Sequence, residues 1–166
     1  MLCSWALEEG FDRAGIARLR PSEHGDALAA WLARGDDAEM TYLGRRQEIR
    51  RDPRRILPGA QSVVCVAQRY SPLIDENEGS GDLWPRVARY ARGEDYHRFM
   101  ERRLHRLEAR IRDHLPAADT RIYVDTGPVL ERELAARAGL GSVGKNTNLL
   151  DPEIGSWFLL GELFLT

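Results

Sequence analysis

A long amphipathic segment near the middle of the chain limits the folds that are open to it. From His97 to Leu115, apolar side chains recur at intervals of three and four residues, and most positions between them are charged. This spacing puts the apolar residues on one face of an α-helix, which needs a second apolar surface to cover it. The members of that face are Met100, Leu104, Leu107, Ile111 and Leu115.

Candidate strands alternate with candidate helices along the rest of the chain. The segment from Gln61 to Arg69 follows a Pro-Gly turn and is rich in β-branched residues, which predicts a buried strand. Further strands are predicted at 14–19, 87–91, 121–124, 147–150 and 156–165, an exposed loop at 75–82, and helices at 2–9, from Pro21 to about Gly35, and from Pro128 to a stop at Gly139. This alternation predicts an α/β or α+β fold in which helices cover a mixed β-sheet.

The composition excludes several classes of protein. Of 166 residues, 43% are hydrophobic and 30% are charged, a balance typical of one globular domain. No apolar run approaches the ~18 residues that a bilayer helix needs, and the first residues lack the basic region of a secretory signal. We therefore expect a cytoplasmic protein with no membrane partner. The net charge of -2 means that contact with a polyanion has to be local, and the arginine-rich segment 45–55 is the candidate.

The stretch from 124 to 150 contains fragments of three well-known motifs. Residues 139–144 satisfy GxGxxG, but a dinucleotide site needs a strand before the glycines and a helix after them, and here the predicted order is reversed. A P-loop is disfavoured for the same reason, and because Asn146 stands where Ser or Thr should hold magnesium. The DTG triplet at 125–127 would suit an aspartic protease, but the neighbouring helices disfavour that all-β fold.

Asp95, Tyr96 and His97 resemble the start of a D-x-H-x-x-G motif, in which the histidine ligates the cobalt of a corrinoid. Met100 stands in place of the glycine. We therefore do not expect His97 to ligate cobalt, and no protein metal site is predicted.

With these motifs set aside, the stretch still has a definite layout. Asp125 follows a predicted strand and Arg132 lies one turn into the next helix, so that carboxylate and guanidinium can face one cleft. A purely structural pairing of the two is the alternative. Three glycines in six residues then allow a close approach to a ligand, and Lys145 and Asn146 supply hydrogen-bond donors.

Six blocks of sequence occur in one order and together span nearly the whole chain. The blocks are Met40-x-x-Leu43 with Arg50 and Asp52-Pro53; Leu57-Pro58-Gly59-Ala60; Arg89-Tyr90-Ala91-x-Gly93-x-Asp95-Tyr96-His97; Val124-Asp125-x-x-Pro128-x-Leu130-Glu131-Arg132; Ala138-Gly139-Leu140-Gly141-x-x-Gly144-Lys145-Asn146; and Gly155-Ser156-Trp157-x-x-Leu160-Gly161-Glu162. In this order they resemble the N-terminal, cobalamin-binding half of epoxyqueuosine reductase.

The resemblance implies a corrinoid-binding domain that acts in the reduction of epoxyqueuosine to queuosine at the tRNA wobble position. It implies that Asp125 donates a proton as the epoxide opens, and that Arg132 orients Asp125 or the substrate. It further implies cobalamin as the cofactor and the tRNA anticodon loop as a partner. The residues it places around the corrin and its tail are Arg50, Tyr90, Tyr96, His97, Gly144, Lys145, Asn146 and Ser156.

Two departures from the family pattern qualify this expectation. Ser142 stands where the family usually has Trp, and the cysteines that would hold two four-iron iron-sulfur clusters are absent. We therefore expect residues 1–166 to be a cobalamin-binding catalytic domain that ends before a C-terminal iron-sulfur domain, which would relay electrons from a donor. Alone, this fragment is expected to be inactive. The alternatives are a corrinoid-binding module without reductase activity of its own and, third, a P-loop NTPase.

Overall fold

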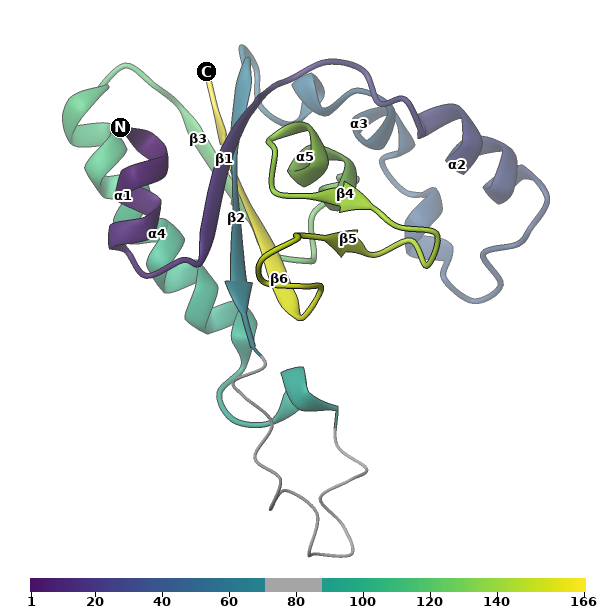
Figure 1. Ribbon diagram of the computed structural model, residues 1–166. Helices are drawn as coiled ribbons and strands as arrows, with labels where there is room; N and C mark the ends of the chain where they lie inside the picture. The colour runs from purple at the N-terminus through teal and green to yellow at the C-terminus, as the bar shows by residue number, and fades with distance from the viewer. Residues whose placement is uncertain (71–87) are drawn as a thin grey trace, which may run out of the picture.

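The computed structural model describes residues 1–70 and 88–166, and its centre is a four-stranded sheet (Figure 1). The final strand of the chain lies between two earlier strands and runs antiparallel to both. The strands are β1 (Arg13–Arg18), β2 (Ser62–Arg69), β6 (Phe158–Leu165) and β3 (Thr120–Tyr123), given in their order across the sheet. Each neighbouring pair is antiparallel, so the predicted mixed sheet is wrong. A hydrophobic pattern marks a strand but not its direction.

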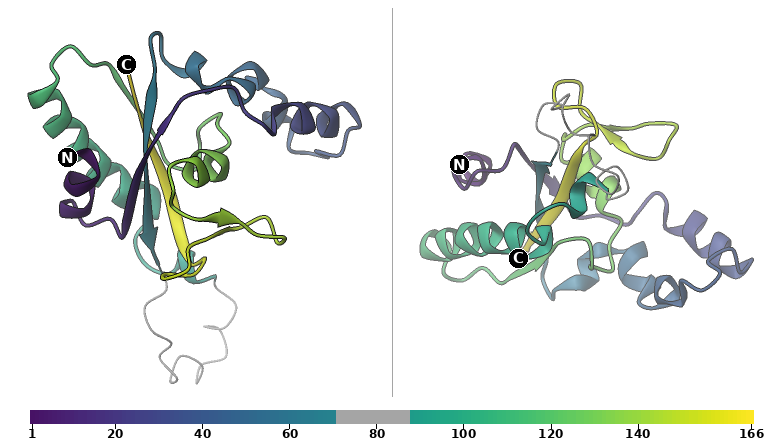
Figure 2. Two further views of the ribbon diagram at one scale, coloured as in Figure 1. Left: turned by 45° about the horizontal axis from the view of Figure 1, so that its top comes forward. Right: turned by 90° about the horizontal axis from the view of Figure 1, so that it is seen from below.

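Helices cover both faces of this sheet (Figures 1 and 2). On one face lie α1 (Leu2–Glu8) and α4 (Tyr96–His114). On the other lies α5 (Glu131–Arg137), with α2 (Gly25–Ala33) and α3 (Gln47–Arg51) on the same side of the sheet. The α/β character and the helical cover that the sequence predicts are therefore confirmed. A small hairpin of β4 (Ser142–Val143) and β5 (Leu149–Leu150) extends beside α5.

Two apolar cores follow from the alternation of side chains along the strands. On β6, Leu163 and Leu165 face the core beneath α1 and α4, whereas Leu160 and Phe164 face the core beneath α5. Four of the five predicted α4 residues are fully buried in the first core. The fifth, Leu115, is 46% exposed because it lies just past the end of the helix.

Most element boundaries agree with the sequence prediction, and four do not. Helix α2 begins at Gly25 instead of Pro21. Residues 89–91 form a 3-10 turn rather than part of a strand. The predicted strand at 147–150 is reduced to Leu149–Leu150. Helix α5 begins at Glu131 instead of Pro128, because Leu130 still has a non-helical backbone conformation. The predicted loop at 75–82 lies outside the described residues.

The helix α5 ends directly against the edge of the sheet. A Cβ at Gly15 of β1 would lie 2.1 Å from the carbonyl oxygen of Ala138, so only glycine allows this approach. Gly139 then ends the helix with a φ of 82°, as predicted. The glycine-rich turn thus follows a helix and leads into the β4–β5 hairpin. This order excludes the dinucleotide and P-loop arrangements at these glycines.

Candidate functional site

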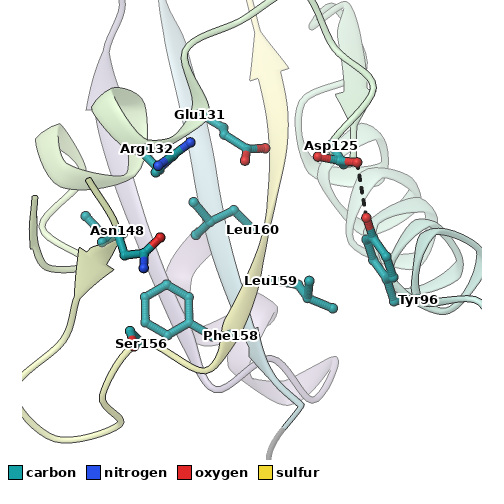
Figure 3. A pocket seen from close by; sticks show the side chains of 10 residues that line it. Tyr96, Asp125, Glu131, Arg132, Asn148, Ser156, Phe158, Leu159 and Leu160 are labelled. Atoms are coloured by element: carbon teal, nitrogen blue, oxygen red, sulfur yellow. Dashed lines mark hydrogen bonds between the residues drawn. The ribbon is translucent and has the colours of Figure 1, made fainter. Parts of the chain in front are cut away.

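A cavity of about 200 Å³ opens on the α5 side of the sheet (Figure 3). Its apolar wall comes mainly from β6, and its polar groups come from the start of α4, the β3–α5 loop, the start of α5 and the segment around the hairpin. The lining residues are Tyr96, Asp125, Glu131, Arg132, Asn148, Leu149, Ser156, Phe158, Leu159 and Leu160. The expectation that Asp125 and Arg132 face one cleft is confirmed.

Asp125 occupies a tight turn between β3 and α5. Its φ is 59°, in the left-handed region that side chains other than glycine seldom adopt, and the amide of Thr126 donates to the carbonyl of Val124 at 2.6 Å. Such a conformation costs on the order of 1–3 kcal/mol and is concentrated at functional sites. The turn leaves the Asp125 side chain 58% exposed, so that the carboxylate can meet a ligand.

Two side chains from the first turn of α4 hold the carboxylate of Asp125. The hydroxyl of Tyr96 donates to Oδ2 at 3.1 Å (Figure 3). Nε2 of His97 lies 3.5 Å from the same oxygen. Burial and the Asp125 carboxylate raise the pKa of Tyr96 well above its usual value, so the phenol keeps its proton. Both contacts involve Oδ2, so Oδ1 remains available to a ligand in the cavity.

His97 bridges two carboxylates. Its Nδ1 lies 2.8 Å from Oδ1 of Asp95, and its ring stacks on Tyr96 with centroids 4.0 Å apart. Partial burial lowers the pKa of His97, but the hydrogen bonds and charges of Asp95 and Asp125 outweigh it and raise that pKa. A raised pKa favours the imidazolium form, which stabilises the charge on Asp125.

Arg132 contacts a different partner from the one expected. Its Nη1 donates to the carbonyl oxygen of Thr147 at 2.6 Å and to the hydroxyl oxygen of the same residue at 3.2 Å. The guanidinium therefore ties α5 to the hairpin turn while it lines the cavity. In this arrangement Tyr96 and His97, rather than Arg132, orient Asp125.

The other predicted cofactor-binding residues are spread around the cavity. Ser156 lines it, and Tyr90 is 50% exposed and packs edge-on against Tyr96 at 6.2 Å. Gly144, Lys145 and Asn146 lie in the turn of the β4–β5 hairpin and are not among the lining residues, whereas Asn148 and Leu149 of the same hairpin are.

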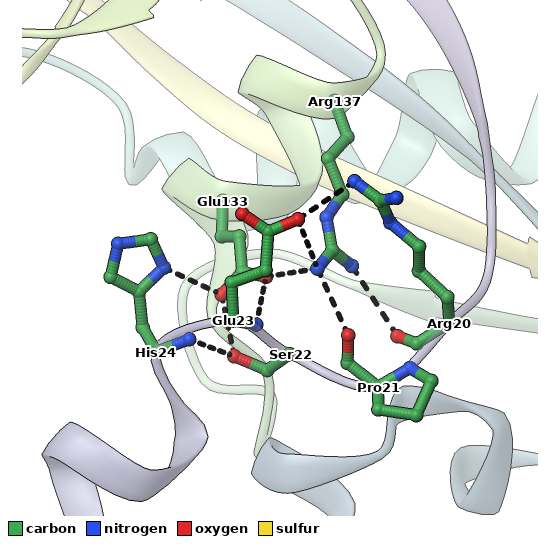
Figure 4. Close-up of polar contacts among 7 residues, drawn as sticks. All are labelled: Arg20, Pro21, Ser22, Glu23, His24, Glu133 and Arg137. Carbon is green, nitrogen blue, oxygen red and sulfur yellow. Dashed lines mark hydrogen bonds and ion pairs between the residues drawn. The ribbon is translucent and has the colours of Figure 1, made fainter.

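Arg50 lies apart from the main cavity, in a second and smaller hollow that also contacts Glu133 and Arg137. Burial lowers the pKa of Arg50, and its Nη1 donates to the carbonyl of Arg45. Glu133 closes this hollow: it accepts from the Ser22 hydroxyl at 2.6 Å and pairs with Arg137 at 2.5 Å (Figure 4). These contacts fix α5 to the segment that precedes α2.

Glu133→Ala is therefore expected to destabilise the fold. The change removes a carboxylate whose side chain is 10% exposed, and it leaves the guanidinium of Arg137, 11% exposed, without this ion pair. Loss of such charged hydrogen bonds should lower the free energy of unfolding by about 2 kcal/mol, measured by urea denaturation. Glu153→Ala, which removes an exposed ion pair with Arg13, is the matched control and should cost less. Equal losses in the two variants would contradict this role of Glu133.

Sequence reasoning gave no role to three residues of the site. Asn148 and Glu131 line the cavity directly, and Glu162 lies beneath it on β6. Burial and the charge of Asp125 raise the pKa of Glu131 to about 7, against an opposing effect of Arg132. Glu162 is 1% exposed, and neither of its carboxyl oxygens has a hydrogen-bond partner among the described residues. A charged residue in the apolar run of 158–165 was the available sequence clue.

Comparison with known proteins shows what this chain is similar to. Residues 50–126 match the family model described as Epoxyqueuosine reductase QueG, DUF1730. The epoxyqueuosine reductase of Vibrio cholerae is 39% identical over 169 residues, which cover 97% of this chain and 44% of that protein. This chain matches the N-terminal region of epoxyqueuosine reductases. It spans about half the length of the curated relatives that it resembles.

Solved structures of epoxyqueuosine reductases share this fold. One, in complex with a tRNA-Tyr epoxyqueuosine-modified tRNA stem loop, is 28% identical with a TM-score of 0.82, over 99% of this chain and 44% of that chain. Another, from Bacillus subtilis with its catalytic aspartate loop swung out of the active site, is 26% identical with a TM-score of 0.80, over the same shares of the two chains. Within the described residues, every helix is too short or too polar to cross a membrane.

Proposed function

We propose that this chain is the cobalamin-binding catalytic part of a cytoplasmic reductase that converts epoxyqueuosine to queuosine in tRNA, with Asp125 as the proton donor. The observation that carries the proposal is the position of Asp125 in a left-handed turn at the mouth of the cavity. The swung-out catalytic aspartate loop of a relative supports the idea that such a turn belongs to the chemistry.

The contacts of Asp125 suit an acid that protonates the oxygen of an opening epoxide. As the C–O bond breaks, negative charge develops on oxygen, and a carboxyl group within hydrogen-bond distance can neutralise it. Tyr96 and His97 both address Oδ2. The transferred proton would therefore reside on Oδ1, and the resulting carboxylate would be stabilised by the phenol and the imidazolium.

The chemistry of the cavity lining supports the binding of part of a corrinoid. Phe158, Leu159 and Leu160 offer an apolar surface to a large ring, and Asn148 and Ser156 offer hydrogen-bond partners at its edge. A volume of about 200 Å³ is too small for a whole cofactor, so this cavity would hold only the reacting region. When bound, cobalamin would supply the reducing power at the substrate, with electrons relayed from a donor by the expected C-terminal iron-sulfur domain.

For tRNA, two features of the chain support contact with a single-stranded loop. The exposed aromatic rings of Tyr90 and Trp157 lie near the cavity, and unpaired bases stack on such rings. The arginine-rich segment 45–55 could contact phosphates. The relative in complex with a modified tRNA stem loop supports the same partner.

Cobalamin binding tests the proposal. The intact protein that contains this region should change the absorption spectrum of added cobalamin, as expected when the cofactor loses its lower axial base. Ser156→Trp should weaken this binding by at least about tenfold, because the indole would occupy the cavity. Ser4→Trp on α1 is the control and should bind normally. No spectral change with the wild type would contradict the proposal, and binding without epoxyqueuosine reduction would favour a corrinoid-binding module.

A further inference from the structure

Glu162 is a buried carboxyl that the proposed chemistry leaves unexplained. It lies on β6 between Leu160, which lines the cavity, and Phe164, and the alternation of the strand puts its side chain on the α5 face with theirs. In residues 1–70 and 88–166, no group forms a hydrogen bond with either carboxyl oxygen. A buried polar group without hydrogen bonds is costly, and a buried charge is far more so, which favours the protonated form of Glu162.

Glu131 connects this buried carboxyl with the cavity. It is the first residue of α5 and lines the cavity together with Asp125 (Figure 3). The charges of Asp125 and Glu131 both raise the pKa of Glu162 further, after the larger effect of burial. The three carboxyls therefore form an interacting group that extends from the open cavity to the core of the sheet.

Within the described residues, other titratable groups lie around these carboxyls. His97 on α4 lies 3.5 Å from Oδ2 of Asp125. Arg132 on α5 favours the ionised form of Glu131. The charges of Asp125 and Glu131 both raise the pKa of Tyr96 on α4. Across the sheet, Cys65 of β2 and Tyr123 of β3 are the register neighbours of Glu162. Burial raises the pKa of Cys65, so this thiol adds no charge. In the part of the chain that the structure describes, Arg132 is the charged group that opposes protonation of Glu131.

The reaction proposed above consumes more than one proton. Reduction of an epoxide to an alkene takes up two electrons and two protons and releases one water molecule. Electrons come from an external low-potential donor, but one carboxyl can hold only one of the two protons. Asp125 must therefore be reprotonated within the cycle, or a second group must supply a proton.

We propose that Glu131 is the second proton donor of the site and that Glu162 is a buried, neutral positioning residue behind it. This inference rests on the proposed function. The O–H bond of Glu131 breaks, its proton passes to the carboxylate of Asp125, and the Glu131 carboxylate left behind faces Arg132. A hydronium ion from bulk solvent then returns a proton to Glu131 and leaves a water molecule. Glu162 keeps its own proton throughout. It therefore carries no charge that would repel the carboxylates of Asp125 and Glu131.

Infrared spectroscopy tests the protonation states without turnover. The carbonyl stretch of a protonated carboxyl is separate from the bands of a carboxylate, and isotope labelling of glutamate identifies it. At about pH 8, where exposed glutamates are ionised, one labelled band should remain and should disappear in Glu162→Gln. A second band should titrate near neutral pH and be absent from Glu131→Gln. If Glu162→Gln removes no protonated band, the inference is overturned.

Turnover of the intact reductase tests the proton transfer itself. Glu131→Gln should lower kcat by about 10²-fold, with KM for tRNA unchanged and the loss of activity at high pH shifted or abolished. Glu131→Asp should restore part of the activity, and the exposed Glu101→Gln on α4 should behave as wild type. A wild-type pH profile in Glu131→Gln would overturn the inference. If the wild-type protein itself fails to reduce epoxyqueuosine, the proposed function fails instead, and the infrared bands still report on the carboxyl pair.

Discussion

Replacement of Asp125 by asparagine is expected to lower kcat of the intact reductase by about 10²- to 10⁴-fold. Asparagine has nearly the same shape, tolerates a left-handed backbone and can still accept the hydrogen bond of Tyr96. It cannot release a carboxyl proton to the oxygen of the epoxide. The binding of tRNA and of cobalamin should therefore stay close to wild type, and single-turnover assays of product formation would measure the chemical step alone.

Asp95→Asn is the matched control for this experiment. Asp95 contacts Nδ1 of His97 on the far side from Asp125, and it caps α4, a position that asparagine also fills well. The variant weakens the support of the imidazolium but leaves the proposed proton donor in place, so its loss of kcat should be much smaller. If Asp125→Asn retains full turnover, Asp125 is not the acid.

The sequence identified Asp125 but not the residues that hold it. A strand followed by Asp and a helix could be recognised locally, and the resemblance to a family added the role of a proton donor. Tyr96, which donates to its carboxylate, is 29 positions away in the chain. That contact depends on the packing of α4 across the sheet, which no local pattern reports. Arg132 could be expected beside Asp125, yet its hydrogen bonds go to the hairpin turn.

The fold was predictable where local and long-range preferences agree. The periodicity and the capping side chain of Asp95 define α4 to within one residue of its predicted ends. Strand direction was not predictable, because it depends on which edges the connections join. The start of α5 was misplaced because Pro128 is compatible with a first helical turn but equally with the loop found there.

The stability of the fold should fall as the pH rises from about 5 to about 8, and the carboxyls of the cavity are the physical reason. The pKa of Glu131 is raised from an ordinary 4.5 to about 7, so the folded protein binds this proton more tightly than the unfolded chain does. The stabilisation is fully present below pH 4.5 and is lost as the pH passes through the folded value. At about 1.4 kcal/mol per pKa unit, the change is on the order of 3 kcal/mol.

Other groups do not reverse this trend in the same range. The carboxyls whose pKa values are lowered, such as Glu133 and Asp151, complete their stabilising effect once the pH exceeds their ordinary values. The raised pKa of His97 has the same sign as that of Glu131, so it adds to the loss as the pH rises. Urea denaturation at a series of pH values measures the sum of these effects, and Glu131→Gln should flatten the curve.

Glu162→Met separates the effect of the buried carboxyl on the free energy of unfolding from its effect on turnover. Methionine has a similar length and no group that needs a hydrogen bond, so the variant should unfold with a free energy about 1–3 kcal/mol higher than wild type. Removal of Glu162 should also weaken the dependence of stability on pH, because one raised pKa disappears. A less stable variant would mean that the Glu162 carboxyl makes a favourable interaction in the folded protein. A more stable variant with reduced turnover would show that the protonated carboxyl of Glu162 costs stability but supports the reaction.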